Sequence, residues 1–172
     1  IARSFGLSSQ IDAFNVANNL PDLLVSLISG GALALAFIPV LSEYRKKYGS
    51  EPTWKLFSHV ANLVFVSTGI LSILVAIFAP SLVSFELGIA PGFSATQQNL
   101  VVSLMRLNLL ATLIFALSGL IMASHHAHKH FLSPAISPIL YNLGLIFGAI
   151  FLSPRLGVFG LEYGVIIGAV LH

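Results

Sequence analysis

Three uninterrupted apolar stretches constrain this chain more than any other feature. Residues 56–85, 107–127 and 130–154 contain no Asp, Glu, Lys or Arg, and each has the roughly 20 residues that a helix needs to cross about 30 Å of hydrocarbon. The strands of a membrane barrel are shorter and alternate polar with apolar residues, so they do not produce such runs. The chain is 56% hydrophobic and only 8% charged, whereas soluble domains carry about 25% charged residues. The sequence therefore predicts an all-α, polytopic transmembrane helix bundle.

Turn signals divide the chain into about four complete helices, flanked by truncated first and last helices. The complete helices are expected at residues 12–44, 56–85 and 99–124, and from Pro134 to just before the motif SPRLG. The first helix is expected to end at residues 1–5. The last begins near Val158, and its 22 Å or so of helix is too short to span, so we expect it to continue past His172. Residues 1–172 are interpreted as one transmembrane domain.

The charged residues lie mainly in two polar segments, at residues 43–55 and 124–131. These segments hold five of the eight Lys and Arg residues, together with four histidines. The positive-inside rule places both on the cytoplasmic side, and the two predicted crossings between them agree. Because the net charge of +2 arises from such loops, it does not indicate a nucleic-acid partner.

The segment DAFNVANNLPD is the most polar helix-length stretch of the chain. At 100° per residue, its polar side chains and the next serine fall within about 80° of one helix face. They are Asp12, Asn15, Asn19, Asp22 and Ser26. An alternative is that Asp12 is simply the N-cap of a helix whose outer end lies among the lipid headgroups. Intramembrane acids, however, usually face a bundle interior or a water-filled cavity, so this face is predicted to line a substrate cavity.

Arg106 lies about eight residues, or some 12 Å, into its predicted helix. It extends to the outer interface, or else Arg106 or a cation outside residues 1–172 provides the counter-charge to Asp12 or Asp22 in the cavity. The histidines of the second basic segment match no standard zinc spacing, so a solvated loop is favoured over a metal site. GxxxG patterns at Gly144 and at 160–168 predict close helix packing, within one chain rather than between two.

No catalytic residues, metal site or cofactor are predicted from these patterns. The sequence contains no cysteine, which excludes disulfides and thiol chemistry. It also lacks a nucleophile–base pair and a phosphate-binding glycine loop. A transporter or flippase is favoured over an enzyme, and a non-transporting membrane scaffold protein is the alternative from another class.

Several motifs, taken in order, resemble one family of transporters. ARSFGLSSQIDAFNVANNLPDLL is followed by GGALALAFIPVLSEY, APGF and FLSPAISPILYNLGLI. Together they resemble the MurJ (MviN) family, the lipid II flippases of the MOP transporter superfamily. The resemblance implies a 14-helix protein of two lobes in the bacterial inner membrane, of which this chain is a partial N-lobe. The implied partners are the lipid-linked precursor lipid II, membrane lipids and the missing C-lobe of the same chain.

The family moves its substrate to the outer leaflet by alternating access through a cationic cavity, in which Arg side chains can replace the counterions of the diphosphate. Asp12 matches the acid that the family has at the start of its second helix. Charged family positions are replaced here by Asn19, Val25, Ser26 and Gly30. The resemblance and the residues therefore leave three functions open: lipid II transport, export of another lipid-linked glycan or a drug, and a scaffold role.

Overall fold

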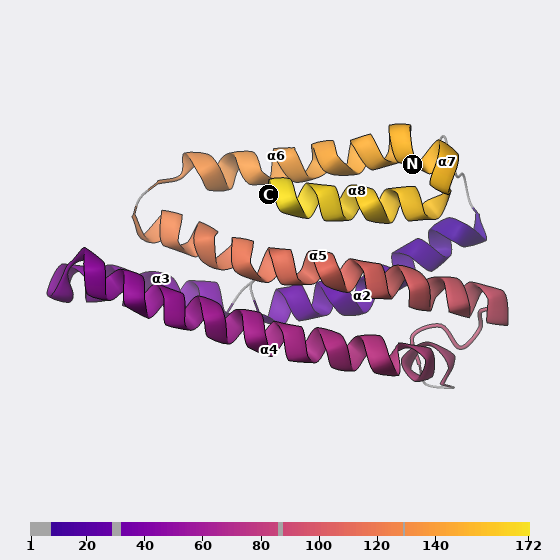
Figure 1. Ribbon diagram of the computed structural model, residues 1–172, viewed down its shortest axis with the longest axis horizontal. Coiled ribbons are helices and arrows are strands. Elements are labelled where there is room, and N and C mark those ends of the chain that lie inside the picture. The colour runs from indigo at the N-terminus through magenta and orange to yellow at the C-terminus, as the bar shows by residue number, and fades with distance from the viewer. Residues whose placement is uncertain (1–7, 29–31, 86–87, 129) are drawn as a thin grey trace.

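The computed structural model describes residues 8–28, 32–85, 88–128 and 130–172, and over them it contains helices and connecting turns but no strand (Figure 1). The elements are α2 (Ser9–Ile28), α3 (Ala32–Tyr48), α4 (Ser50–Ser84), α5 (Ala95–Ala127), α6 (Leu132–Phe147), the π-helical turn η1 (Gly148–Leu152), α7 (Ser153–Leu156) and α8 (Val158–Leu171). Three helical stretches are long and apolar enough to cross a membrane: Ser50–Ser84, Ala95–Ala127 and Leu132–Leu156. The predicted all-α membrane bundle is thus confirmed.

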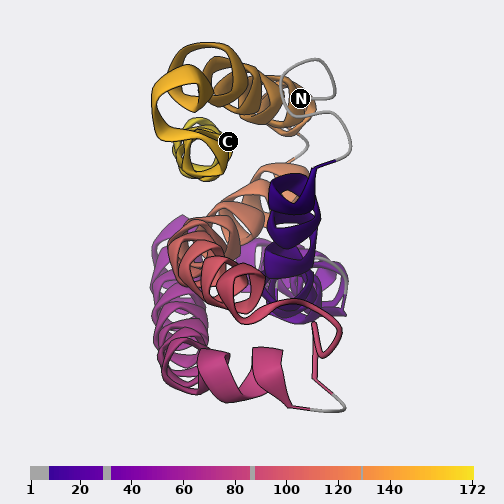
Figure 2. The same cartoon turned by 90° about the vertical axis from the view of Figure 1, so that its right-hand side faces the viewer.

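Helix α5 is the element around which the others are arranged. It packs against α2, α3 and α4, and also against α6 and α8. Figure 2 shows the α6–α8 pair as a separate layer on one side of α5. Met105 of α5 and Leu161 of α8 belong to the larger buried cluster, which also includes Phe14 of α2. This core holds α2 against α5 and turns its other face outward.

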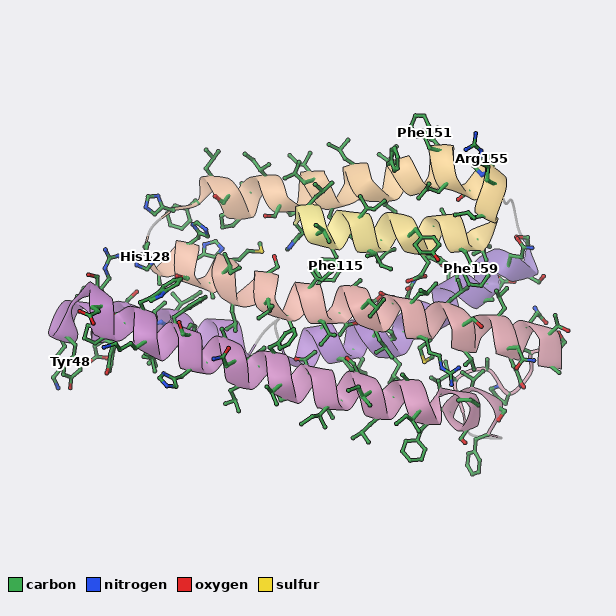
Figure 3. The ribbon with its side chains drawn as sticks, in the orientation of Figure 1. Tyr48, Phe115, His128, Phe151, Arg155 and Phe159 are labelled. Atoms are coloured by element: carbon green, nitrogen blue, oxygen red, sulfur yellow. The ribbon has the colours of Figure 1, made fainter. Side chains whose placement is uncertain are left out.

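From α3 onward, the helix connections alternate between the two ends of the bundle. Tyr48, at the end of α3, and His128, in the α5–α6 connection, lie at one end, and Arg155 lies at the other (Figure 3). The two basic segments therefore share one side, as the sequence predicts.

The polar segment SEYRKKYGSEPTWK is helical, so its prediction as a loop is wrong. Helix α3 continues to Tyr48 and α4 begins at Ser50, with a break only at Gly49, whose φ of 84° glycine adopts without steric cost. Lys55 Nζ lies 3.1 Å from Glu51 Oε1 one turn away, on the exposed start of α4. The 35 residues of α4 make about 52 Å of helix, so a charged end can project beyond the hydrocarbon.

Two further helix boundaries differ from the sequence prediction. The expected helix at residues 12–44 is described as two helices, α2 and α3, and the residues between them, including Gly30, lie outside the described part. The helix that follows Pro134 does not end before SPRLG but continues to Leu156 through η1. There the N–H and the hydroxyl of Ser153 both donate to the Gly148 carbonyl, the latter at 3.1 Å. This wider turn carries the helix past Pro154, which has no N–H of its own. The predicted end of a first helix at residues 1–5 also lies outside the described part.

Glycines bring α6, η1 and α8 into backbone contact. A Cβ atom added to Gly148 would lie 2.6 Å from the Gly164 Cα, and one added to Gly144 would collide with the backbone of Gly168. The GxxxG patterns therefore pack against each other within the chain, as predicted. Close backbone approach of this kind replaces the hydrophobic effect as the source of helix association in lipid.

The substitution Gly164→Ala is expected to weaken this contact. Its Cβ would stand 2.9 Å from the Gly148 Cα, so the two backbones must separate, at a cost of about 1–3 kcal/mol. Gly69→Ala is the matched control, because its Cβ would meet only a side-chain atom of Leu113 at 3.9 Å and alanine favours the helix. Unfolding of the purified, detergent-solubilised protein measures both. Equal stability of the two variants would contradict the proposed packing.

Candidate functional site

The five polar residues predicted to line a cavity lie on one exposed face of α2. Asp12, Asn15, Asn19, Asp22 and Ser26 are all exposed. The opposite face of the helix is buried through Ala13, Ala17 and Leu24. The alternation arises because α2 packs on α5 with its small and apolar residues. A polar helix face of this length in a membrane protein requires water or protein opposite it.

Asp12 is not the N-cap of α2. The helix begins at Ser9, and the carbonyl of Ser8 accepts hydrogen bonds from the N–H groups of Ile11 and Asp12, at 3.0 and 3.2 Å. The Asp12 carboxylate therefore lies in the first turn, where the helix dipole favours a negative charge. Its side chain is exposed and is not used up in capping.

Ser26 ends the polar face at its other end. Its hydroxyl donates to the Leu23 carbonyl at 2.8 Å, so the side chain already has a local partner. Intrahelical bonding of this kind is common for serine in membrane helices. It leaves the oxygen of Ser26 able to accept a further hydrogen bond from a ligand.

Asn18 lies outside the exposed polar face of α2 because it faces α5. The Asn108 side-chain amide donates to the side-chain oxygen of Asn18, and the Thr112 hydroxyl donates to the Asn108 carbonyl at 3.2 Å. Asn108 is buried, so this polar link fixes α2 on α5 within the bundle. Sequence reasoning overlooked Asn108, although an asparagine inside an otherwise apolar segment was the available signal.

Arg106 contacts α4 and is not paired with Asp12 or Asp22. Its Nε donates to the Ala76 carbonyl at 3.0 Å. In an α-helix this carbonyl would accept from the N–H four residues later, but that residue is Pro80, which has no N–H. The guanidinium thus supplies the hydrogen bond that Pro80 removes. Within the described ranges the recorded ion pair is Lys55–Glu51, so a counter-charge for α2 from elsewhere in the protein stays a prediction.

Glu162 is an ionisable residue whose environment the sequence does not reveal. The sequence suggests only an acid near a helix start, where the dipole is favourable. In the structure Glu162 is completely buried, and neither carboxyl oxygen has a hydrogen-bond partner. Asp22 of α2 lies within electrostatic range of it.

Comparison with known proteins adds the family. A model described as lipid II flippase MurJ matches residues 1–172. The chain belongs to the MurJ family. The lipid II flippase MurJ of Burkholderia cenocepacia is 34% identical over 176 residues, which cover 100% of this chain and 34% of that protein. The probable lipid II flippase MurJ of Buchnera aphidicola subsp. Acyrthosiphon pisum is 31% identical over 176 residues, with the same coverage of both chains.

A third relative comes from another bacterium. The lipid II flippase MurJ of Thermosipho africanus is 30% identical over 173 residues, which cover 99% of this chain and 34% of that protein. The chain thus spans about a third of the length of these MurJ proteins.

The histidine segment of this MurJ-family chain was interpreted as a solvated loop. Helix α5 instead continues to Ala127. His128 is half-buried, and its Nδ1 lies 2.6 Å from the backbone oxygen of Ser124. The rings of His125 and His130 lie 6.4 Å apart between centroids. Among the described residues, no group of three or more His, Cys, Asp or Glu side chains is placed to hold a metal ion.

Arg106→Ala is expected to lower the free energy of unfolding by about 1–3 kcal/mol, because the Ala76 carbonyl, in a membrane-spanning helix, loses its partner. In a Pro80→Ala background the effect should largely disappear, since residue 80 then donates to Ala76 itself. A double-mutant cycle on the purified protein measures the difference. Arg155→Ala, at an exposed position, is the control. Additive effects would argue against the carbonyl-capping role, and lost transport in a stable Pro80→Ala, Arg106→Ala protein would indicate a role toward substrate.

Proposed function

We propose that this chain forms part of the N-lobe of a multi-pass flippase in the bacterial inner membrane. The flippase carries lipid II, a lipid-linked peptidoglycan precursor, from the inner to the outer leaflet by alternating access. Membership of the MurJ family, and the fact that its relatives are lipid II flippases by name, support this function. On this proposal the protein is a transporter and not an enzyme, and its partners are lipid II, membrane lipids and the remaining lobe.

The exposed polar face of α2 is the observation that carries the proposal. A diphosphate head with sugars cannot cross hydrocarbon unaided, so a flippase must offer it a polar surface at membrane depth. Asn15 and Asn19 provide amide donors and acceptors for sugar and peptide groups. Asp12, Asp22 and Ser26 complete the surface. Arg106 contacts α4 instead, so the proposed surface is built without it.

The charge of this face favours a second candidate substrate. The exposed face of α2 has two acids and no base. The last turn of the helix contains Val25 and Ser26, where the family usually has an arginine pair. A pyrophosphate is bound best by arginine. An exporter of another lipid-linked glycan or of a drug, with a less anionic head, is therefore the second candidate.

Complementation tests the substrate directly. The full-length gene is expected to restore growth of a bacterial strain depleted of its own MurJ. Failure of a protein that is normally inserted in the membrane would rule against lipid II and leave the second candidate. Asp12→Ala, Asn19→Ala and Asp22→Ala should impair rescue. If all three rescue fully, a non-transporting scaffold is favoured.

Thiol labelling tests whether the polar face of α2 meets water. The 172 residues contain no cysteine, so cysteines placed at Asn15 and Asn19 should react with membrane-impermeant reagents in full-length protein whose other native cysteines have been replaced. A cysteine at Ala17, which is completely buried, should not react. Ile73 is the lipid-facing control, since it is 61% exposed on the apolar α4. Equal labelling at Asn15 and Ile73 would contradict the cavity.

A further inference from the structure

Glu162 occupies a position that is unfavourable for a negative charge. Its side chain has no exposed surface, and both carboxyl oxygens lack a hydrogen-bond partner. Burying an ionised carboxylate without partners costs several kcal/mol. The helix dipole near the start of α8 offsets about 0.3–1 kcal/mol of this, up to about 2 in partly buried geometries. The dipole alone is therefore insufficient, and the charge has to be neutralised in another way.

Among the described residues, no cation on the helices packed against α8 forms an ion pair with Glu162. Arg155 of α7 is the nearest of these cations by sequence, and it is exposed. Asp22 of α2 lies within electrostatic range of Glu162 and carries the same charge. Tyr141 of α6 lies within range of both. The titratable residues of α5 are used elsewhere or lie at its end, since Arg106 donates to α4 and the histidines occupy the last turn. At the other end of α8, His172 is paired with the Ser118 hydroxyl at 2.7 Å.

A bound proton fits these surroundings better than a metal ion. Hard cations take six or more oxygen ligands, and the described part of the chain places no three acidic or histidine side chains around a common point. A proton requires only the carboxylate itself. The same proton also removes the electrostatic repulsion between Glu162 and Asp22.

Glu162 lies where two parts of the bundle meet. Helix α8 pairs with α6 through the glycine contacts, and this pair forms a layer distinct from α2, α3 and α4 (Figure 2). The polar face of α2 and the buried acid of α8 thus belong to different layers. Ionised Glu162 favours an arrangement in which the layers separate enough for water to reach it.

We propose that Glu162 is a proton-binding site whose occupancy holds the α6–α8 layer against α2. The carboxylate takes up a proton from water when the layers are apart and releases it to water when they separate again. The site makes the conformation of the lobe sensitive to protons. This inference does not depend on which lipid-linked substrate the protein carries.

Infrared spectroscopy of the full-length protein in lipid nanodiscs, without substrate, tests the proton directly. The wild type should show a protonated-carboxyl C=O band at neutral pH that is lost on alkaline titration. Glu162→Gln, which keeps the shape, and Glu162→Leu, which keeps an apolar core, should each lose that band. Glu43→Gln is the control, because Glu43 is exposed on α3 and should leave the band intact. Absence of the band from wild type, or its persistence in the Glu162 variants, would overturn the proposal.

Labelling of a cysteine at Asn15 then reports the conformational consequence. The thiolate is the reactive form, so the rate is divided by that of a free thiol such as glutathione at the same pH. This ratio should depend on pH in the otherwise wild-type protein and lose that dependence in Glu162→Gln. A rate that follows sodium concentration at constant pH would replace the proton by a metal ion and overturn the assignment. Both measurements omit substrate, so they are independent of complementation, and failure of rescue bears on lipid II alone.

Discussion

The absence of water in hydrocarbon is the constraint on which this structure depends. Backbone groups within the membrane must find partners in the protein, which selects helices and makes every helix interruption a local problem. Two such helix interruptions are compensated by polar side chains. The Arg106 guanidinium binds the carbonyl that Pro80 leaves free, and Ser153 binds the Gly148 carbonyl at the π-helical turn before Pro154. In each case a polar side chain serves the backbone and not a ligand.

The same constraint explains how the helices associate. Apolar side chains gain little by leaving lipid, so close packing and a few polar links must hold the bundle together. The glycines of α6 and α8 allow backbone contact, and the Asn18–Asn108 hydrogen bond connects α2 to α5. These contacts leave the polar face of α2 that runs from Asp12 to Ser26 exposed. A helix that is fixed on one side and polar on the other is suited to form the wall of a transport pathway.

The charge of α2 bears directly on the choice of substrate. The exposed face of α2 presents two carboxylates, and Arg106, the cation considered as their counter-charge, is engaged with α4. A third acid, Glu162, is buried opposite α2. If lipid II is the substrate, its phosphates must meet positive charge contributed by other parts of the protein. The acids on this side would then be better suited to protons and to the neutral sugar and peptide groups.

The sequence by itself determined the helical class, the alternation of connections between two sides, and the polar face of α2, because composition and a 3.6-residue period act locally. It also indicated the glycine contacts. The prediction of a loop around Gly49 was wrong, because charged residues are as typical of a solvated helix end as of a loop. Only the tertiary structure decided the partners of Arg106 and Asn18 and the complete burial of Glu162. Those depend on which helices become neighbours, and helical periodicity gives the face of a residue but not the element that covers it.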